Sequence, residues 1–285
     1  MTIMVDNNTK LLIQGITGYQ GTYHSKAMAE FGTKVVAGVR FGKGGEMVND
    51  IPVYNTVSEA VEATGANTSC IFVPAPSCKD AALEAIDAGV STIVIVTEHL
   101  PVLDAIHIVA TARAKGITLI GPNCPGVASP GKSKVGILPN KIFKEGNVGL
   151  VSKSGTLTYE IVNAITESNI GQSTCVGIGG DRVSGTSFIE MLAKFEKDKQ
   201  TKKIVLVGEI GGTAEEEAAA YIKKFVKKPV VAYIAGRTAP PGKMMGHAGA
   251  IIARGRGTAE SKIKALEEAG VKVAKFPTDV PELLK

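Results

Sequence analysis

His247 is one of four histidines in 285 residues, and it lies in the stretch Met-Met-Gly-His-Ala-Gly-Ala-Ile-Ile, between Gly246 and Gly249. No nearby His, Cys or carboxylate has the spacing of a metal site, so a metal ligand is disfavoured. The remaining interpretations are a general base oriented by a distant acid, a covalent carrier, and a structural histidine in a loop. The glycines leave space for an incoming group, which favours the covalent carrier.

A second stretch, Val-Ser-Lys-Ser-Gly-Thr at residues 151–156, could hold a phosphate. It ends an apolar strand, and Leu157, Ile161 and Ile165 follow at the spacing of one helix face. Hydroxyl groups, a glycine and the free N–H groups of a helix start can bind phosphate. Such strand–helix joints are common, but together with His247 this one favours a phosphohistidine, whose two negative charges need donors.

A third stretch is the glycine-rich turn from Gly15 to Gly21, which follows an apolar strand and precedes a helical pattern. Its spacing is G-x-x-G-x-x-G, whereas dinucleotide-binding loops have G-x-G-x-x-G. The next strand ends at Arg40, with Lys43 shortly after, where NAD enzymes carry an acid for the ribose diol. NAD is therefore disfavoured. NADP and coenzyme A remain as ligands, and simple solvent exposure of the two basic residues remains the alternative.

The elements that must position these groups alternate between strand and helix. In the first half, continuous apolar runs predict strands at residues 10–16, 34–39, 69–75, 92–97 and 117–121. Four of the helical patterns between strands end at a glycine, which supplies the left-handed residue after a helix: Gly32, Gly65, Gly89 and Gly116. This alternation predicts a doubly wound α/β domain over residues 1–122.

Residues 121–146 are rich in Pro, Gly and Lys, and they predict a linker with irregular structure. The alternation then resumes, with predicted strands at 147–152, 174–178, 204–208, 230–235 and 271–276. One helix between them carries Phe188, Met191, Leu192 and Phe195 on one face. Another begins at Thr213 with acidic residues in its first turn, where they stabilise the helix dipole. Residues 123–285 thus form a second predicted α/β domain.

Composition excludes several classes of protein. No apolar run approaches the roughly 18 residues that span a bilayer, so no membrane partner is expected. The net charge of +5 is dispersed and aromatic residues are few, so no nucleic-acid partner is expected either. The four cysteines form no C-x-x-C pair. The N-terminus lacks a targeting pattern, which predicts a cytoplasmic protein, or a mitochondrial-matrix protein if a presequence has been removed.

Nine segments, in order from Ile16 to Ile252, resemble the alpha subunits of succinate–CoA ligase (succinyl-CoA synthetase): ITGYQGTYHS, FGKGG, VPAP, GPNCPGV, SKSGTLTYE, GEIGG, AEEEAAAYI, YIAGRTAP and GHAGAII. With the domain pattern, the resemblance covers essentially the whole chain. It implies an N-terminal Rossmann-like coenzyme A-binding domain, followed by a second, flavodoxin-like parallel α/β domain.

The resemblance also implies roles for single residues. The phosphorylated residue matches His247, and Glu209 matches the acid that holds the other ring nitrogen. The matching coenzyme A contacts are Thr17, Gly18, Tyr19, Gln20, Lys43, Val96, Thr97 and Glu98. Ser154 and Gly155 match the helix start that holds the phosphate, and Tyr159 matches a position at the succinate site. No metal site is implied in this chain.

The implied activity is the interconversion of succinyl-CoA, nucleoside diphosphate and phosphate with succinate, coenzyme A and nucleoside triphosphate, through a phosphohistidine in the citric acid cycle. The chain has no G-x-x-x-x-G-K-[ST] loop, and Gly-Arg-Gly-Thr at residues 255–258 fails that spacing. The resemblance implies that a beta subunit binds Mg²⁺ and ATP or GTP, in an αβ or α₂β₂ assembly.

Three alternatives remain. Another nucleoside-diphosphate-forming acyl-CoA ligase, for acetate or malate, would use the same architecture. An NADP-dependent oxidoreductase would leave His247 without a role. A coenzyme A-binding regulator without catalytic activity would need neither His247 nor Glu209.

Overall fold

The computed structural model describes residues 3–240, 242–252 and 257–285, which form two compact units. The first unit comprises Val5–Asn140 together with Val183–Gly185, and the second comprises residues 3 and 4, Lys141–Arg182 and Thr186–Lys285. In the structure the units therefore divide later in the chain than residue 122, the boundary that the sequence suggested. None of the helices within the described ranges combines the length and apolar character needed to cross a bilayer.

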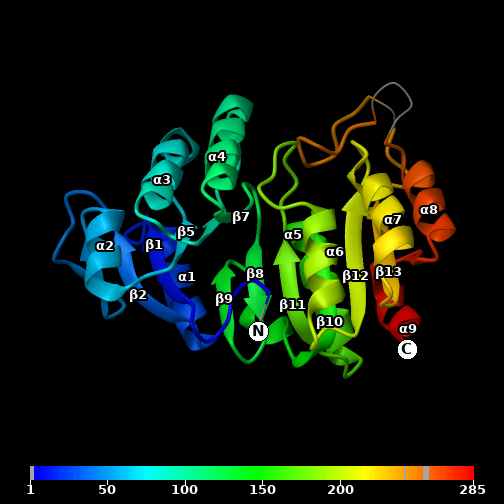
Figure 1. Ribbon diagram of the computed structural model, residues 1–285, viewed down its shortest axis with the longest axis horizontal. Coiled ribbons are helices and arrows are strands. Elements are labelled where there is room, and N and C mark those ends of the chain that lie inside the picture. The colour runs from blue at the N-terminus through cyan, green and yellow to red at the C-terminus, as the bar shows by residue number, and fades with distance from the viewer. Residues whose placement is uncertain (1–2, 241, 253–256) are drawn as a thin grey trace. The chain divides into compact units, whose positions relative to one another are not determined.

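The first unit is built on a parallel sheet with strand order β4-β2-β1-β5-β6-β7 and with β3 antiparallel to β4 at the edge. When the parallel strands are numbered along the chain, this is the Rossmann order 3-2-1-4-5-6. The sheet contains all five predicted strands. Strands β1, β2, β5 and β7 of this sheet are labelled in Figure 1. The strands of the unit are β1 Lys10–Gln14, β2 Lys34–Val39, β3 Met47–Val48, β4 Ile51–Tyr54, β5 Thr68–Ile71, β6 Thr92–Ile95, β7 Thr118–Ile120, β8 Gly126–Ser129 and β9 Ser133–Gly136. The helices are α1 Tyr19–Glu30, α2 Val57–Thr64, α3 Ala75–Asp87 and α4 Val102–Ala114.

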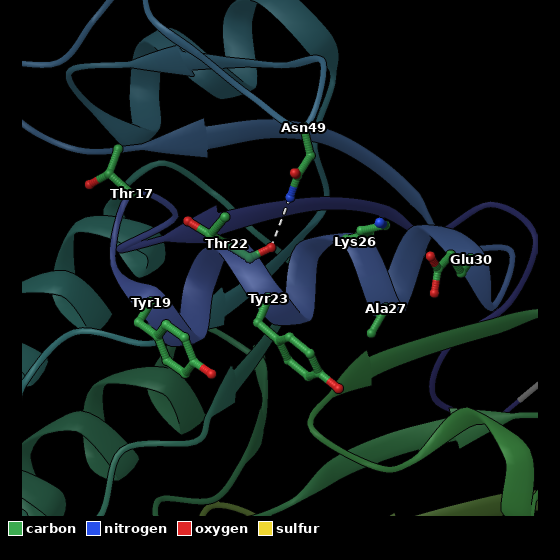
Figure 2. A pocket seen from close by; sticks show the side chains of 8 residues that line it. All are labelled: Thr17, Tyr19, Thr22, Tyr23, Lys26, Ala27, Glu30 and Asn49. Atoms are coloured by element: carbon green, nitrogen blue, oxygen red, sulfur yellow. Dashed lines mark hydrogen bonds between the residues drawn. The ribbon is translucent and has the colours of Figure 1, made fainter.

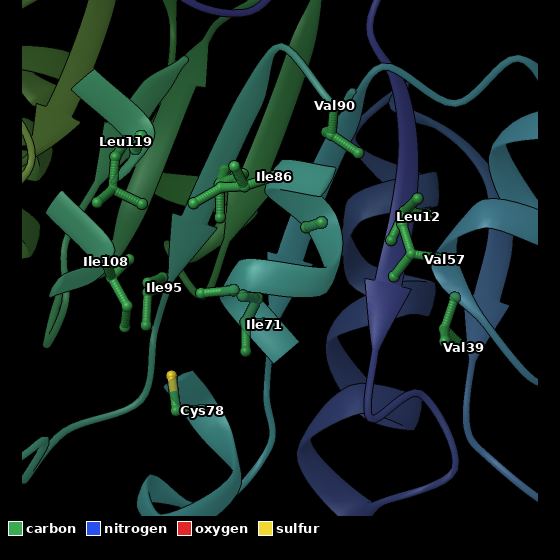
Figure 3. Close-up of a cluster of buried hydrophobic side chains, with 14 of the residues drawn as sticks. Leu12, Val39, Val57, Ile71, Cys78, Ile86, Val90, Ile95, Ile108 and Leu119 are labelled. Atoms are coloured by element: carbon green, nitrogen blue, oxygen red, sulfur yellow. The ribbon is translucent and has the colours of Figure 1, made fainter. Parts of the chain in front are cut away.

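A core of apolar side chains lies between this sheet and α2, α3 and α4 (Figure 3). Strand residues such as Leu12, Ile71 and Ile95 are fully buried against helix residues such as Ile86 and Ile108. Burying each such side chain contributes about 1.5–3 kcal/mol, and this holds the helices on the sheet. The four glycines predicted to end helices all have positive φ angles, which confirms that prediction.

The prediction of a linker with irregular structure is wrong for residues 126–136. There β8 and β9 form an antiparallel hairpin whose eight strand residues are all buried. The hairpin belongs to the first unit, where the hydroxyl of Thr33 donates to the carbonyl of Lys134 at 2.7 Å. The Pro-Gly pair that suggested a linker forms the hairpin turn, in which Gly131 has a φ of +76°.

The second unit contains a parallel sheet with strand order β14-β13-β12-β10-β11. Numbered along the chain, this is the flavodoxin-like order 2-1-3-4-5, and all five predicted strands are present. The strands are β10 Glu145–Ser152, β11 Gln172–Gly177, β12 Lys203–Glu209, β13 Val230–Ala235 and β14 Lys272–Ala274. The helices are α5 Gly155–Glu167, α6 Phe188–Lys197, α7 Ala214–Phe225, α8 Ala259–Glu268 and α9 Val280–Leu284. A second apolar core includes Leu150, Val205 and Ile161.

The helix predictions for this unit are also confirmed. The four apolar side chains predicted for one face of a helix are the buried face of α6: Phe188, Met191, Leu192 and Phe195. The next helix, α7, follows Thr213 and has three glutamates in its first turn.

Candidate active site

His247 lies in a narrow loop between β13 and α8. Met244 and Ile251 form an isolated antiparallel bridge at the base of the loop, and the amide of Met245 donates to the carbonyl of Ala250 at 2.9 Å. Gly246 has a φ of +79°, which only glycine adopts readily, so this residue permits the turn that precedes the histidine. The backbone therefore presents His247 near the tip of a short hairpin-like loop.

The imidazole of His247 contacts the carboxylate of Glu209, the last residue of β12. The distance from Nδ1 to Oε2 is 2.7 Å, and the two side chains are 26% and 9% exposed. This hydrogen bond raises the pKa of His247 above 6.5 against the opposing effect of burial, and the charges of Glu209 and Asp181 raise it further, whereas Lys153 lowers it. With Nδ1 donating to the carboxylate, neutral His247 keeps its lone pair at Nε2.

Glycines on neighbouring segments let the histidine and its loop pack closely. Gly180 follows β11, and a Cβ atom there would lie 2.3 Å from Cγ and Nδ1 of His247. The amide of Gly249 donates to the carbonyl of Gly180 at 3.3 Å. A Cβ atom on Gly211 would lie 2.0 Å from the carbonyl oxygen of Gly249. The sequence analysis did not identify Gly180, although a Gly-Gly pair directly after a strand was a possible signal.

The helix start predicted to hold phosphate lies at the same edge of the sheet as Glu209. Ser154 is the N-cap of α5, and its hydroxyl accepts from the amide of Leu157 at 3.3 Å. Strand order reverses between β10, which leads into α5, and β12, which ends at Glu209. The carboxyl ends of two strands at such a reversal flank the usual ligand crevice of an α/β sheet.

Ser154 and Glu209 therefore follow or end the two strands at this reversal, and His247 contacts Glu209. Within the described part of the chain, neither Ser154 nor Gly155 hydrogen-bonds His247. Tyr159, one turn further along α5, is half-buried and packs against the second core. The described residues contain no group of three His, Cys, Asp or Glu side chains that could hold a metal. Residues 255 and 256 of the Gly-Arg-Gly-Thr segment lie outside the described residues.

In the first unit, the glycine-rich turn connects β1 to α1. Gly18 is the N-cap of α1, so the amides of the first turn, which includes Tyr19 and Gln20, have no partners within the helix. A Cβ atom on Gly21 would lie 2.3 Å from the carbonyl oxygen of Gly15, so this glycine lets α1 start directly against the strand end. The turn adjoins the point between β1 and β5 where strand order reverses.

The other predicted coenzyme A contacts follow strands of the same sheet. Lys43 lies on the surface after β2 and forms an ion pair with Glu46 at 2.7 Å. Val96, Thr97 and Glu98 follow β6, and the hydroxyl of Thr97 donates to the carbonyl of Val73 at 2.7 Å. Because the strands are parallel, these segments and the glycine turn all lie at the carboxyl edge of the sheet.

A pocket of about 580 Å³ begins at the glycine turn and runs along α1 (Figure 2). It includes Thr17 and Tyr19 from the predicted site, whereas its remaining residues were not among the predicted contacts. The side-chain amide of Asn49, one of the residues that line it, donates to the backbone carbonyl of Thr22 at 2.8 Å (Figure 2). The pocket is lined by Thr17, Tyr19, Thr22, Tyr23, Lys26, Ala27, Glu30 and Asn49.

Comparison with known proteins relates both units to coenzyme A chemistry. Residues 6–99 match the model of the CoA binding domain, and residues 151–272 match that of the CoA-ligase family. The chain is 59% identical to succinate–CoA ligase [ADP-forming] subunit alpha 2 of Archaeoglobus fulgidus over 284 residues, which cover 100% of this chain and 99% of that protein. The chain belongs to the succinate–CoA ligase alpha-subunit family.

Further relatives agree with this assignment. The Staphylococcus aureus succinate–CoA ligase [ADP-forming] subunit alpha is 54% identical over 284 residues, which cover 100% of this chain and 94% of that protein. The solved structure of Methanosaeta concilii ATP citrate lyase in complex with (3S)-citryl-CoA has a TM-score of 0.90 and 27% identity. That alignment covers 98% of this chain and 49% of the lyase, so the chain spans about half its length.

Membership of the succinate–CoA ligase alpha-subunit family confirms the resemblance seen in the sequence and the interpretation of the chain as part of an acid–thiol ligase. It also confirms the succession of a coenzyme A-binding domain and a ligase domain. The roles of the individual site residues stay predictions.

Proposed function

We propose that this chain is the alpha subunit of an ADP-forming succinate–CoA ligase that carries a phosphoryl group on His247. The observation that carries the proposal is the 2.7 Å contact between Nδ1 of His247 and the carboxylate of Glu209. A carboxylate that holds one ring nitrogen fixes the tautomer and makes the other nitrogen a better nucleophile. The names of the similar relatives support the reaction and the nucleotide.

In the first step, the lone pair on Nε2 of His247 attacks the γ-phosphorus of ATP. An N–P bond forms, the P–O bond to the β-phosphate breaks, and ADP leaves with the electron pair. The proton on Nδ1 stays on the ring, where Glu209 stabilises the positive charge that develops as Nε2 becomes bonded to phosphorus. Ser154 and Gly155 at the start of α5 then supply donors for the phosphate oxygens.

In the second step, a carboxylate oxygen of succinate attacks the phosphorus. The N–P bond breaks, its electron pair returns to Nε2, and succinyl phosphate forms. The thiolate of coenzyme A then attacks the acyl carbon, and phosphate leaves, while the proton of the thiol has passed to solvent. In this scheme Tyr159 contacts succinate, and coenzyme A is bound by the glycine turn from Thr17 to Gln20, by Lys43 and by the segment from Val96 to Glu98.

The scheme requires a partner. We expect a beta subunit to bind ATP and Mg²⁺, and the metal, when bound there, neutralises charge on the phosphates during transfer. An αβ or α₂β₂ assembly and a place in the citric acid cycle are parts of the same proposal. We also propose a cytoplasmic location, because the similar relatives come from an archaeon and a bacterium.

The test is labelling of the complex that this chain forms with its partner. After incubation with γ-labelled ATP, we expect an acid-labile, base-stable phosphate on His247 that succinate and coenzyme A remove together. His247→Asn should retain the fold and coenzyme A binding but lose both the label and turnover. Succinyl-CoA formation by the His247→Asn complex at the unsubstituted rate would refute the phosphohistidine. Assays with acetate and malate in place of succinate test the alternative acids.

A further inference from the structure

The lysine within the Ser-Lys-Ser-Gly stretch was not among the predicted site residues. Lys153 lies between the end of β10 and the N-cap of α5, and its side chain is 17% exposed. Its ammonium lies 2.8 Å from Oε1 of Glu215 and 5.5 Å from the centroid of the Phe188 ring. An ion pair and a ring contact together hold this flexible side chain in one place, at the same edge of the sheet as Glu209.

Glu215 connects Lys153 to the histidine site. Its side chain is fully buried, and Oε1 accepts a hydrogen bond from the backbone amide of Glu209 at 3.3 Å. Oε2 forms an ion pair with Lys262, which is fully buried as well and donates to the carbonyl of Gly211 at 2.7 Å. One oxygen of Glu215 thus contacts both the ammonium of Lys153 and the backbone of Glu209, the residue that holds His247.

A phosphoryl group on His247 would lie beside a carboxylate, so a nearby cation is needed to stabilise it. Phosphorylation of His247 adds about two negative charges beside the carboxylate of Glu209. These charges and the carboxylate repel each other. Lys262 already contacts Glu215 and also lies 3.8 Å from a carboxylate oxygen of Glu216. Lys153 has three N–H donors, and within the described ranges Glu215 is the one carboxylate in ion-pair contact with it. Its remaining donors are available to an anion.

The effect of Lys153 on His247 supports the same conclusion. The positive charge of Lys153 lowers the pKa of the imidazole, against the hydrogen bond to Glu209 and the charge of Asp181, which raise it. The field of this ammonium therefore acts at the ring that would carry the phosphoryl group.

We propose that Lys153 is the cation that stabilises the phosphoryl group on His247, and that Glu215, anchored by Lys262, positions it. This inference rests on the proposed function, since it assigns a further residue to the same site. The ammonium stabilises the phosphohistidine and the charge on phosphorus during each transfer, and no proton moves to or from Lys153.

The experiment compares four forms of the complex with the partner subunit: unsubstituted, Lys153→Met, Lys153→Arg and Lys264→Met. Lys264 is a matched control, because it belongs to the same unit but lies 79% exposed on α8. The readouts are the fraction of His247 labelled by γ-labelled ATP at equilibrium and the lifetime of the label after nucleotide removal. Because a hydrogen bond to a charged group is lost, we expect Lys153→Met to reduce the labelled fraction about 10- to 100-fold. Lys153→Arg should restore most of it, and Lys264→Met should match the unsubstituted complex.

A second readout uses the chain alone. The NMR titration of His247 should have a higher midpoint in Lys153→Met than in the unsubstituted chain, whereas a lysine with a purely structural role would leave the midpoint unchanged. Equal labelling of the Lys153→Met and unsubstituted complexes would overturn the inference, and so would a loss that Lys153→Arg does not restore. Absence of label on the unsubstituted complex would instead overturn the proposed function, and the role of Lys153 with it.

Discussion

Replacing Glu209 with Gln tests the pair at the centre of the site. The substitution keeps the shape of the side chain and an oxygen that can accept from Nδ1, but it removes the charge. The contact is 2.7 Å long and the Glu209 side chain is 9% exposed, so solvent screens it little. A hydrogen bond to a charged group contributes about 1.5–3 kcal/mol. Because each 1.4 kcal/mol or so is a factor of ten, we expect phosphorylation to slow by about 10- to 100-fold where the imidazole is neutral.

The pH dependence of the phosphorylation rate separates this loss of rate from a change in the protonation of His247. In the unsubstituted chain, the carboxylate favours protonated His247, so the nucleophilic neutral form appears only as the pH rises through a pKa above 6.5. Glu209→Gln should move that midpoint down towards 6.5. The raised pKa also stabilises the folded chain below pH 6.5, and this contribution is lost as the pH rises through the folded-state pKa. The variant should therefore lose more stability at about pH 6 than at about pH 9.

Two measurements are needed: the labelling rate of the complex across pH, and the NMR titration of His247 in the chain alone. Thermal unfolding at the two pH values gives the stability difference. Glu209→Gln could leave both the NMR midpoint and the labelling rate at alkaline pH unchanged. This result would show that the carboxylate neither raises the pKa of His247 nor orients its ring, and it would refute the reasoning.

Three further substitutions have expected outcomes. Gly180→Ala should reduce phosphorylation at least about tenfold while leaving coenzyme A binding intact, because the new Cβ would lie 2.3 Å from the imidazole; labelling and calorimetry check this. Lys43→Glu should weaken coenzyme A binding in calorimetry, most strongly at low salt, whereas Lys79→Glu in the same unit should not. Lys262→Met should lower the free energy of unfolding by about 1–3 kcal/mol, because the buried carboxylate of Glu215 loses one of its two cations, whereas Lys264→Met on the same helix should have little effect in thermal unfolding.

The sequence predicted the parallel sheets well, because buried strands of such sheets are continuous apolar runs. It missed the two hairpins, β3–β4 and β8–β9, because their turns were not recognised. In one of them, Asn49 and Asp50 both have positive φ angles and form the turn between β3 and β4, a use of Asn and Asp that the sequence analysis overlooked. In the other, the residues Pro-Gly were interpreted as a linker.

The candidate site was predictable only in part. His247 was apparent from its glycine-flanked stretch, and Glu209 was identified only through the resemblance. The sequence analysis did not identify Gly180, Lys153 or Glu215 as site residues, because their importance depends on which strand ends lie side by side. Strand order and register determine those neighbours, and no local pattern encodes a contact between residues about sixty positions apart, such as Lys153 and Glu215.

Because the site is assembled from several strand ends, it forms only when the protein has folded. The segments that meet at His247 follow β11, β12 and β13 and are far apart in the sequence, so the imidazole has its surroundings only when these strands have paired in the right order. Contacts between distant segments form late and slowly during folding. A partly folded chain would have the histidine but neither the carboxylate to orient it nor the glycine surface to support it. Under the proposed mechanism, chains that have not finished folding would therefore be inactive.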